Sequence, residues 1–418
     1  MDSRFKKLDP ETIETRTAAF SVYLMDLWSF IPYYMSNLCT ALRAESVDAR
    51  LGSVRYHLDR NYFRNVGIRT DPVLLDFGGG LKSTFLRRIL KTFEYFVNLF
   101  VLGLRLPLLG PHILHVQFLP LLDRGFQFEI WFLQWIRSRG VKIVYTVHNL
   151  ADRDSRDDSK PLYEEVYGLA DAIICHGREA REKLISNFKV PAEKIRIIPH
   201  GPMFSEKPVE TKADSRMKLG LPVDETLVLC AGVINEYKGI PFLLDAWKRL
   251  AESGVKKRLL IAGTGDANLL DQVRGKVEAE HLGPTVSLWL RFIPVVELPL
   301  LYQAADILVY PYKAGTTSGA LLTGLNYEKA IITTRLPFFR EHLKEDIEAI
   351  MVGYGDIDGM AQALAQLINE PAKRESLSRG ATKRIATDDS WKNIARATIE
   401  CYRSSSTPAD YRPNWSPQ

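Results

Sequence analysis

The stretch DILVYPYKAGTTSGALLTGLNYEKAIITT, residues 306–334, decides the fold class of this chain. Its two ends, 306–312 and 329–334, are short runs that are apolar on both faces, which is typical of buried parallel strands. The segment between them, 318–329, has the pattern of a helix. A strand, a helix and a second strand in this order predict an α/β fold with a doubly wound sheet.

The same alternation extends from this stretch along most of the chain. Strand-like runs lie at 18–26, 112–119, 142–148, 171–177 and 195–201, and again at 226–234, 257–265 and 284–293. Helix-like segments lie between them, for example at 128–140, 178–188 and 240–254. The polar stretch 201–222 contains three prolines and breaks the pattern, so we expect the inter-domain linker there. The predicted domains are 1–204 and 205–387, with a ligand cleft between them.

The composition excludes several classes of protein. The chain has 418 residues, of which 46% are hydrophobic and 25% charged, so wholesale disorder and collagen-like fibres are excluded. Its four cysteines, Cys39, Cys175, Cys230 and Cys401, lie far apart, which argues against a disulfide framework or a zinc finger and favours a reducing compartment. The first 17 residues contain no apolar run, so we expect no signal peptide.

Positive charge is concentrated in one part of the first half. Between Arg50 and Gly110 there are ten basic and four acidic residues, whereas the net charge of the whole chain is only +5. Such a local excess favours an anionic surface or substrate. No basic–aromatic module or zinc-finger spacing accompanies it, so we expect no nucleic-acid partner.

Within this basic region, residues 83–110 combine cations with a long apolar run. Arg87, Arg88 and Lys91 lie among Leu, Ile and Phe, and the uncharged run 95–104 is too short to span a membrane. Two interpretations remain open: a core helix followed by a loop, or an interfacial helix on anionic lipid. The preceding FGGGLKST, residues 77–84, lacks the glycine directly before lysine that a phosphate loop needs, and predicts a turn.

Three loops in the second half could hold an anion. GVINEYKG (232–239) follows a strand and places Lys238 before a helix that begins near Pro241, and IAGTGD (261–266) offers Gly263 and Gly265 for close backbone approach. In GTTSGALLTGL (315–325), Thr317 and Ser318 are natural helix N-caps and Gly319 opens the helix. IAGTGD alone is a weak signal, but the two helix starts near Lys238 and Ser318 converge at adjacent strand ends and predict a diphosphate site.

In the first half, His148 ends a strand at the predicted cleft. An imidazole there suits proton transfer or hydrogen bonding near neutral pH. His115, His176 and His200 also lie near strand ends, so position alone does not choose among them.

Taken together, these pieces resemble the GT-B glycosyltransferases, and in particular family 4. The resemblance covers about residues 110–345 and rests on YTVHN (145–149), ADAIICHGREAREKL (170–184), IRIIPHG (195–201), GVINEYKG, IAGTGD and the stretch 301–334. It implies two Rossmann-like domains that face a central cleft, with the acceptor on the first and a nucleoside diphosphate sugar on the second. It also implies a last helix, about 388–404, that packs back on the first domain.

The resemblance assigns roles to individual residues. It implies hexosyl transfer from a UDP- or GDP-sugar, with Lys238 on the diphosphate, His148 beside the reacting centre, and no required cofactor or metal. The donor site would comprise Gly232, Lys238, Gly263, Gly265, Thr317, Ser318, Gly319 and Thr323. The aromatic loop 26–34 would hold the acceptor, a glycan or lipid-linked sugar, on Trp28, Tyr33 and Tyr34.

The chain also departs from the family pattern. Val233 replaces the usual arginine, Gly315 and Thr323 replace the usual pair of glutamates, and Glu328 replaces a glycine. A subgroup with a Thr-Ser-Gly turn matches Thr317–Gly319. The missing glutamates leave a catalytically silent nucleotide-binding protein as an alternative, and a sugar-nucleotide epimerase as another. The leading expectation is a cytoplasmic enzyme of polysaccharide or glycolipid synthesis, peripheral to the inner face of the membrane.

Overall fold

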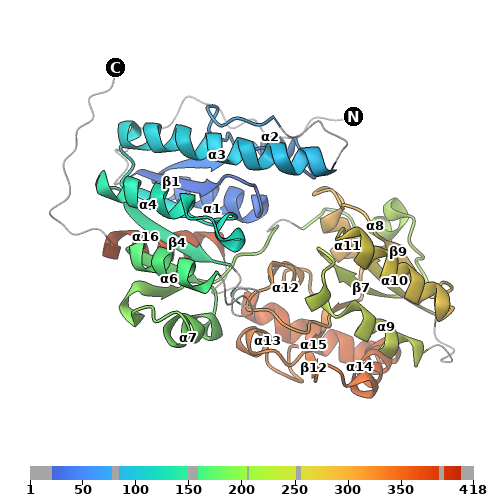
Figure 1. The fold of residues 1–418 in the computed structure, drawn as a ribbon. Coiled ribbons are helices and arrows are strands. Elements are labelled where there is room, and N and C mark those ends of the chain that lie inside the picture. The colour runs from blue at the N-terminus through green and yellow to red at the C-terminus, as the bar shows by residue number, and fades with distance from the viewer. Residues whose placement is uncertain are drawn as a thin grey trace.

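A computed structural model describes residues 21–77, 84–148, 150, 159–204, 207–250, 256–385 and 390–405, with the backbone alone for 84–88, 382–385 and 405. Within these ranges the chain forms two α/β domains joined by a linker near residue 204 (Figure 1). Most of the turn 77–84 and the residues after Ser405 lie outside this description.

The first domain contains a six-stranded parallel sheet in the order β2-β1-β3-β4-β5-β6. Its strands are β1 (Ser21–Asp26), β2 (Asp48–Ser53), β3 (Ile113–Val116), β4 (Lys142–Val147), β5 (Ala172–Cys175) and β6 (Ile195–Ile197). Helices cover both faces: α1 (Pro32–Ala44), α2 (Tyr62–Asn65), α3 (Thr84–Leu109), α4 (Phe128–Ser138), α6 (Lys160–Leu169) and α7 (Arg178–Ser186), with short 3-10 turns η2 (Leu122–Arg124) and η3 (Ala192–Lys194).

The second domain repeats the architecture with the strand order β12-β11-β10-β7-β8-β9. Its strands are β7 (Thr226–Ala231), β8 (Lys257–Ala262), β9 (Val286–Trp289), β10 (Ile307–Tyr310), β11 (Ala330–Thr334) and β12 (Ile350–Val352). Its helices are α8 (Lys212–Leu219), η4 (Glu236–Lys238), α9 (Ile240–Lys248), α10 (Ala267–Ala279), α11 (Leu298–Ala304), α12 (Gly319–Leu325), α13 (Pro337–His342), α14 (Ile357–Asn369) and α15 (Pro371–Ile385).

The strand order of the second sheet fixes where its loops meet. The sequence of strands reverses direction between the neighbours β7 and β10. At such a switch point the loops leave the sheet in opposite directions and open a crevice at the carboxyl ends of the strands. The loops that carry Lys238 and Ser318 follow these two strands, so the fold brings them together.

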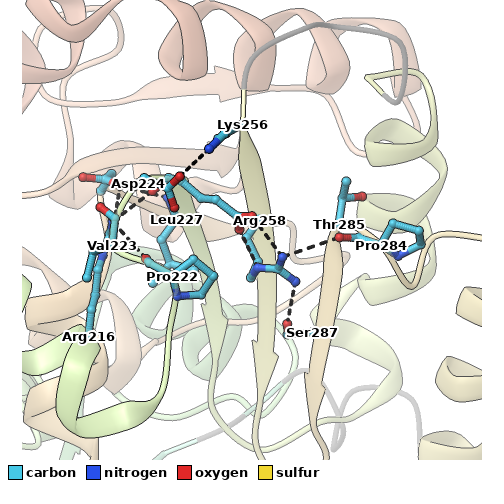
Figure 2. Close-up of polar contacts among 12 residues, drawn as sticks. Arg216, Pro222, Val223, Asp224, Leu227, Lys256, Arg258, Pro284, Thr285 and Ser287 are labelled. Atoms are coloured by element: carbon cyan, nitrogen blue, oxygen red, sulfur yellow. Dashed lines mark hydrogen bonds and ion pairs between the residues drawn. The ribbon is translucent and has the colours of Figure 1, made fainter.

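The opposite end of this sheet is closed by arginines (Figure 2). The buried Arg216 donates from Nη1 to the carbonyls of Val223 and Glu225 at 3.1 and 2.9 Å, and pairs with Asp306 at 2.6 Å. Arg258 pairs with Glu225 and donates to Ser287 at 3.2 Å (Figure 2). These contacts satisfy backbone groups at the start of the strands, and helix α8 is thereby tied to the sheet.

The last helix, α16 (Trp391–Ser405), returns to the first domain and packs against α1 (Figure 1). Tyr402 and Ile394 join the apolar cluster on that face of the first sheet, and Trp391 donates to the carbonyl of Pro202 at 2.9 Å. The C-terminal segment therefore covers the first domain and holds the linker, as the GT-B resemblance implies.

Candidate active site

Lys238 lies buried at the switch point of the second sheet. Its Nζ donates to the Tyr312 hydroxyl and sits 3.9 Å from the centroid of the Tyr312 ring. A Cβ atom on Gly232 would lie 3.7 Å from Nζ, so the lysine stretches over the end of β7. Burial lowers the pKa of Lys238, and among the described residues no carboxylate lies within ion-pair distance of it. A buried cation in this state is suited to an anionic ligand.

A line of hydroxyls connects Lys238 to the start of α12. The Tyr312 hydroxyl lies 3.3 Å from Ser318 Oγ, which caps α12 by accepting from the amide of Leu321 at 3.1 Å. Thr317 Oγ1 is buried without a hydrogen-bond partner among the described residues. Lys238, Thr317 and Ser318, which were predicted from the sequence, therefore lie close together. Tyr312 was not predicted, and it connects Lys238 with Ser318.

The predicted glycines Gly263 and Gly265 allow two loops to pack closely beneath Lys238. Gly263 has φ 156°, and a Cβ atom there would lie 1.8 Å from the carbonyl oxygen of Gly232. A Cβ atom on Gly265 would lie 2.2 Å from the carbonyl oxygen of Ile234. These glycines let the loops after β7 and β8 touch, so the structure gives them a packing role beneath the lysine.

Thr323 forms a hydrogen bond with the inter-domain linker. Its buried hydroxyl donates to the Gly319 carbonyl at 2.7 Å and accepts from the amide of Met203 at 2.8 Å. Both hydrogen bonds are with the backbone, so the position predicted to bind the donor instead joins α12 to the inter-domain connection. Gly319 is equally close to the linker, because a Cβ atom there would lie 3.1 Å from His200 Cε1.

Across the cleft, His148 belongs to a cluster of rings. His148 Nδ1 lies 3.1 Å from His176 Nε2, and His148 Nε2 lies 2.8 Å from the side-chain amide of Gln117. His176 Nδ1 lies 2.9 Å from the carbonyl oxygen of Ile198. The Tyr34 ring stands edge-on to His148 at 4.9 Å, and His200 lies 4.9 Å from the same tyrosine.

These distances fix the tautomers of the two imidazoles. Burial lowers the pKa of His176 to about 3, so this ring is neutral, and its Nδ1 must donate to the Ile198 carbonyl. His176 Nε2 is then an acceptor, and His148 donates to it from Nδ1. His148 Nε2 faces Gln117 Oε1 at 2.8 Å, and when the His148 ring is neutral this nitrogen accepts from the Gln117 NH₂ in the flipped orientation of the amide. That orientation also satisfies Gln117 Nε2, which is otherwise a buried donor without a partner among the described residues.

Only some of the aromatic residues in the predicted acceptor loop, 26–34, are accessible to a ligand. Tyr34 is buried among the histidines and Trp391, so the expectation that it stacks on an acceptor is wrong for this arrangement. Tyr33 is half-buried and contacts Tyr62 and Phe204 edge-on.

Trp28 instead begins a row of rings that leads to His148. Trp28 is stacked parallel to the exposed Phe30 at 6.0 Å, and Phe30 contacts Phe118 at 5.1 Å. Phe118 in turn stacks on His148 at 5.1 Å. Phe30 and Phe118 were not among the predicted site residues.

A cavity of about 910 Å³ opens between the two domains beside this cluster. His176, Arg178 and Ile197 line it from the first domain, and Pro337 and Arg340 from the second. Glu341 bridges the domains by accepting from the amide of Arg178 at 3.1 Å. The cleft is thus polar and bordered by charges of both signs.

The structure describes the side chain of one of the three residues predicted to contact the membrane. Lys91 points inward, because it is buried and pairs with Glu94 at 2.7 Å and Asp76 at 3.4 Å. The expectation that it faces lipid is therefore wrong. The side chains of Arg87 and Arg88 lie outside the described residues. Across the described ranges, no three His, Cys, Asp or Glu side chains gather as a metal site.

Two family models match the chain in succession. Residues 33–202 match Glycosyltransferase Family 4, and residues 211–384 match Glycosyl transferases group 1. An uncharacterized glycosyltransferase of Methanocaldococcus jannaschii is 25% identical over 59% of this chain and 64% of its own length. A D-inositol 3-phosphate glycosyltransferase of Saccharomonospora viridis is 26% identical over 63% of this chain and 65% of its own length. The chain thus spans just under two thirds of these relatives.

A solved structure shares the whole architecture. Anabaena HepE in complex with UDP-glucose superposes with a TM-score of 0.72 at 12% identity, over 92% of this chain and 99% of that one. The two matched regions correspond to the two Rossmann-like domains, and their boundary falls between residues 202 and 211. The chain therefore belongs to the GT-B glycosyltransferases of the family 4 type.

Proposed function

We propose that this protein transfers a hexose from a UDP- or GDP-sugar to a carbohydrate or lipid-linked acceptor. The observation that carries the proposal is Lys238, a buried cation at the switch point with no carboxylate counter-ion among the described residues. A diphosphate supplies the missing negative charge, and the family relationship makes a nucleotide sugar its natural source. The structural similarity to a UDP-glucose complex supports the same class of donor.

In this proposal Lys238 acts mainly on the leaving group. Negative charge on the diphosphate grows as the bond to the sugar breaks, and a preorganised cation in a desolvated site stabilises that charge. Tyr312, which accepts a hydrogen bond from Nζ, keeps the lysine aimed toward Gly232. Because Lys238 supplies the cation, we propose that transfer needs no metal. Donor turnover should then persist in a metal chelator.

His148 serves the acceptor side in this proposal. Both of its ring nitrogens are engaged, one with His176 and one with Gln117, so the ring is held in a single orientation. In this orientation the ring can position the acceptor by packing against it, and a hydrogen bond from Nε2 to a sugar hydroxyl would replace the contact with Gln117. The row Trp28–Phe30–Phe118 lies beside it and offers apolar faces to a sugar ring or a lipid stem.

Nucleotide binding and donor hydrolysis test the proposal. We expect UDP or GDP to raise the melting temperature, and the shift to grow with the logarithm of nucleotide concentration. Lys238→Ala should reduce the shift at a given nucleotide concentration, whereas Lys256→Ala, which removes an exposed lysine paired with Asp224, should leave it intact. Absence of any nucleotide effect on the unsubstituted protein would contradict the proposal.

A catalytically silent protein is a second candidate, and Thr323 favours it. The hydroxyl at this position is committed to the linker, and Gly315 has no side chain, so neither replaces a glutamate of the usual pair. Slow hydrolysis of a radiolabelled UDP- or GDP-sugar supports the transferase. Nucleotide binding with no turnover of any donor supports the silent protein.

We also propose that the protein works in the cytoplasm, at the inner face of the membrane, in the synthesis of a polysaccharide or glycolipid. The polar lining of the cleft and the aromatic row fit an acceptor that has both a sugar and a lipid part.

A further inference from the structure

Helix α3 turns apolar side chains to solvent as well as to the core. Its inward side buries four apolar residues in the core, Tyr95, Leu99, Leu102 and Leu106, together with the polar residues Lys91, Glu94 and Asn98. Its outward stripe is apolar: Phe93, Phe100, Leu104 and Leu108 are between 56 and 85% exposed. A surface helix normally turns its polar side chains to solvent. Four exposed apolar side chains along one stripe therefore indicate that this stripe faces something other than water.

The inward polar residues fix α3 to the domain. Asn98 exchanges two hydrogen bonds with the backbone of Leu75, at 2.8 and 2.9 Å, and Arg105 pairs with Asp71 at 2.6 Å. By length and composition alone the helix could span a membrane over Ile89–Leu109, although Glu94 and Arg105 leave only a short uncharged run within it. Spanning would strip these partners from buried polar groups at a cost of about 1–3 kcal/mol each, so the helix is better placed lying on a membrane.

Helix α4 extends the apolar stripe with aromatic side chains. Trp135 Nε1 donates to the Gly103 carbonyl of α3 at 2.7 Å, and Trp131 lies 5.2 Å from Phe128. Both tryptophans are about half exposed. The two helices together form what we call the α3–α4 face: Phe93, Phe100, Leu104, Leu108, Trp131 and Trp135.

Cations stand at the two ends of α4. Arg139 lies 3.9 Å over the Trp135 ring, and Arg124, just before the helix, lies 5.8 Å over the Trp28 ring. Neither pairs with a carboxylate among the described residues. Tryptophan and arginine around an apolar surface match the interfacial region of a bilayer with anionic headgroups.

From these observations we propose that the α3–α4 face docks onto the surface of an anionic phospholipid bilayer. The face is continuous with the proposed acceptor row, because Arg124 rests on Trp28, the first ring of the row. Docking would therefore place a membrane-borne acceptor beside the path to His148. The docking itself does not depend on which sugar is transferred.

Co-sedimentation with vesicles tests the docking. We expect the full chain to bind vesicles of phosphatidylcholine with phosphatidylglycerol, and to bind less to phosphatidylcholine alone. Phe100→Asp removes an apolar side chain and adds a repelled charge, so binding should fall roughly tenfold or more. Val296→Asp in the second domain, where the side chain is 73% exposed, is the matched control and should bind as before. Equal binding of both variants would overturn the proposal.

Two further measurements separate the other occupants of this face. Arg139→Gln should lose about fivefold in binding to the anionic vesicles, as expected for one interfacial cation, and nothing on phosphatidylcholine. If the face instead meets a second copy of the chain, size-exclusion chromatography without vesicles shows a dimer that Phe100→Asp dissociates. Hydrolysis of the donor by Phe100→Asp in vesicle-free buffer should equal that of the parent, so a failed docking test leaves the proposed transfer untouched.

Discussion

The two sheets have the same architecture, but their cleft-facing edges differ in chemistry. The first edge is a cluster of rings, in which His148, His176 and Tyr34 contact one another. The second edge holds Lys238, a single buried cation, over glycines. The same fold thus presents directional hydrogen bonds on one side of the cleft and charge on the other. The contrast fits the transfer proposed above, in which one edge orients the acceptor and the other stabilises the leaving group.

The largest expected effect is that of a substitution at Gly263, one of the glycines that pack beneath Lys238. Gly263→Ala would place a Cβ atom 1.8 Å from the Gly232 carbonyl oxygen at a φ of 156°. We expect a loss of about 4 kcal/mol or more in the free energy of unfolding, measured in urea. Gly275→Ala is the control: this glycine lies inside α10 with nothing within 4 Å of the added atom, and should gain about 0.5–1 kcal/mol.

Lys238→Met should have opposite effects on activity and stability. It keeps an apolar stem but removes the charge, so donor turnover should fall roughly tenfold to 150-fold, the equivalent of about 1.5–3 kcal/mol for one charge-assisted contact. Removing a buried cation without a carboxylate partner also relieves its desolvation, so the melting temperature without nucleotide should rise or stay unchanged. Turnover equal to that of the parent would show that the charged edge is not the donor site.

Much of this contrast could be predicted from the sequence. Apolar runs and the linker gave the two domains, and convergence of the loops at Lys238 and Ser318 follows from strand order. The edge strands β2 and β12 were missed because DARLGS and IMV are short and, in β2, mostly polar. The local sequence pattern shows which side chains could form an ion pair, but it does not show which of them do so in the folded chain.

The inward side of α3 shows the same limit. Lys91 was expected to face lipid in the interpretation of residues 83–110 as an interfacial helix on anionic lipid. It points inward because Asp76 and Glu94 surround its ammonium group, and Asp76 comes from a separate segment. The contacts of Tyr34 with three histidines from different loops were likewise beyond a local reading of the sequence.

The ring-lined domain should also respond to acid. Burial lowers the pKa of His115 and His176 to about 3 and of His200 to about 4, so near pH 5 these residues bind nearly three protons in the unfolded chain that they do not bind in the folded chain. These histidines therefore make stability fall as pH falls. Burial raises the pKa of Asp26 to about 6 and of Glu129 to about 7, so these two act in the opposite direction.

Over these five residues, the unfolded chain binds about one proton more than the folded chain near pH 5. This difference corresponds to about 1.4 kcal/mol of stability lost per unit fall in pH. Urea unfolding at several pH values measures this slope. Glu129→Gln keeps acceptors for the amides of Leu121 and Leu122 but removes one opposing carboxyl, so the slope should steepen toward two protons. A flat profile between pH 6 and 5 would show that the histidines are not held neutral.

The smallest expected effect concerns His148 itself. Its Nδ1 is committed to His176 and its Nε2 to Gln117, so we expect a positioning role on the acceptor side. His148→Gln retains a donor and an acceptor but cannot take up a proton near neutral pH, so turnover should fall about tenfold, the equivalent of one hydrogen bond, and the acidic limb of the pH–rate profile should persist. His112→Gln, an exposed histidine on the opposite end of β3, is the control. A loss of roughly 10²–10⁴-fold with disappearance of that limb would instead make His148 the general base, and would require its ring to leave Gln117 when the acceptor binds.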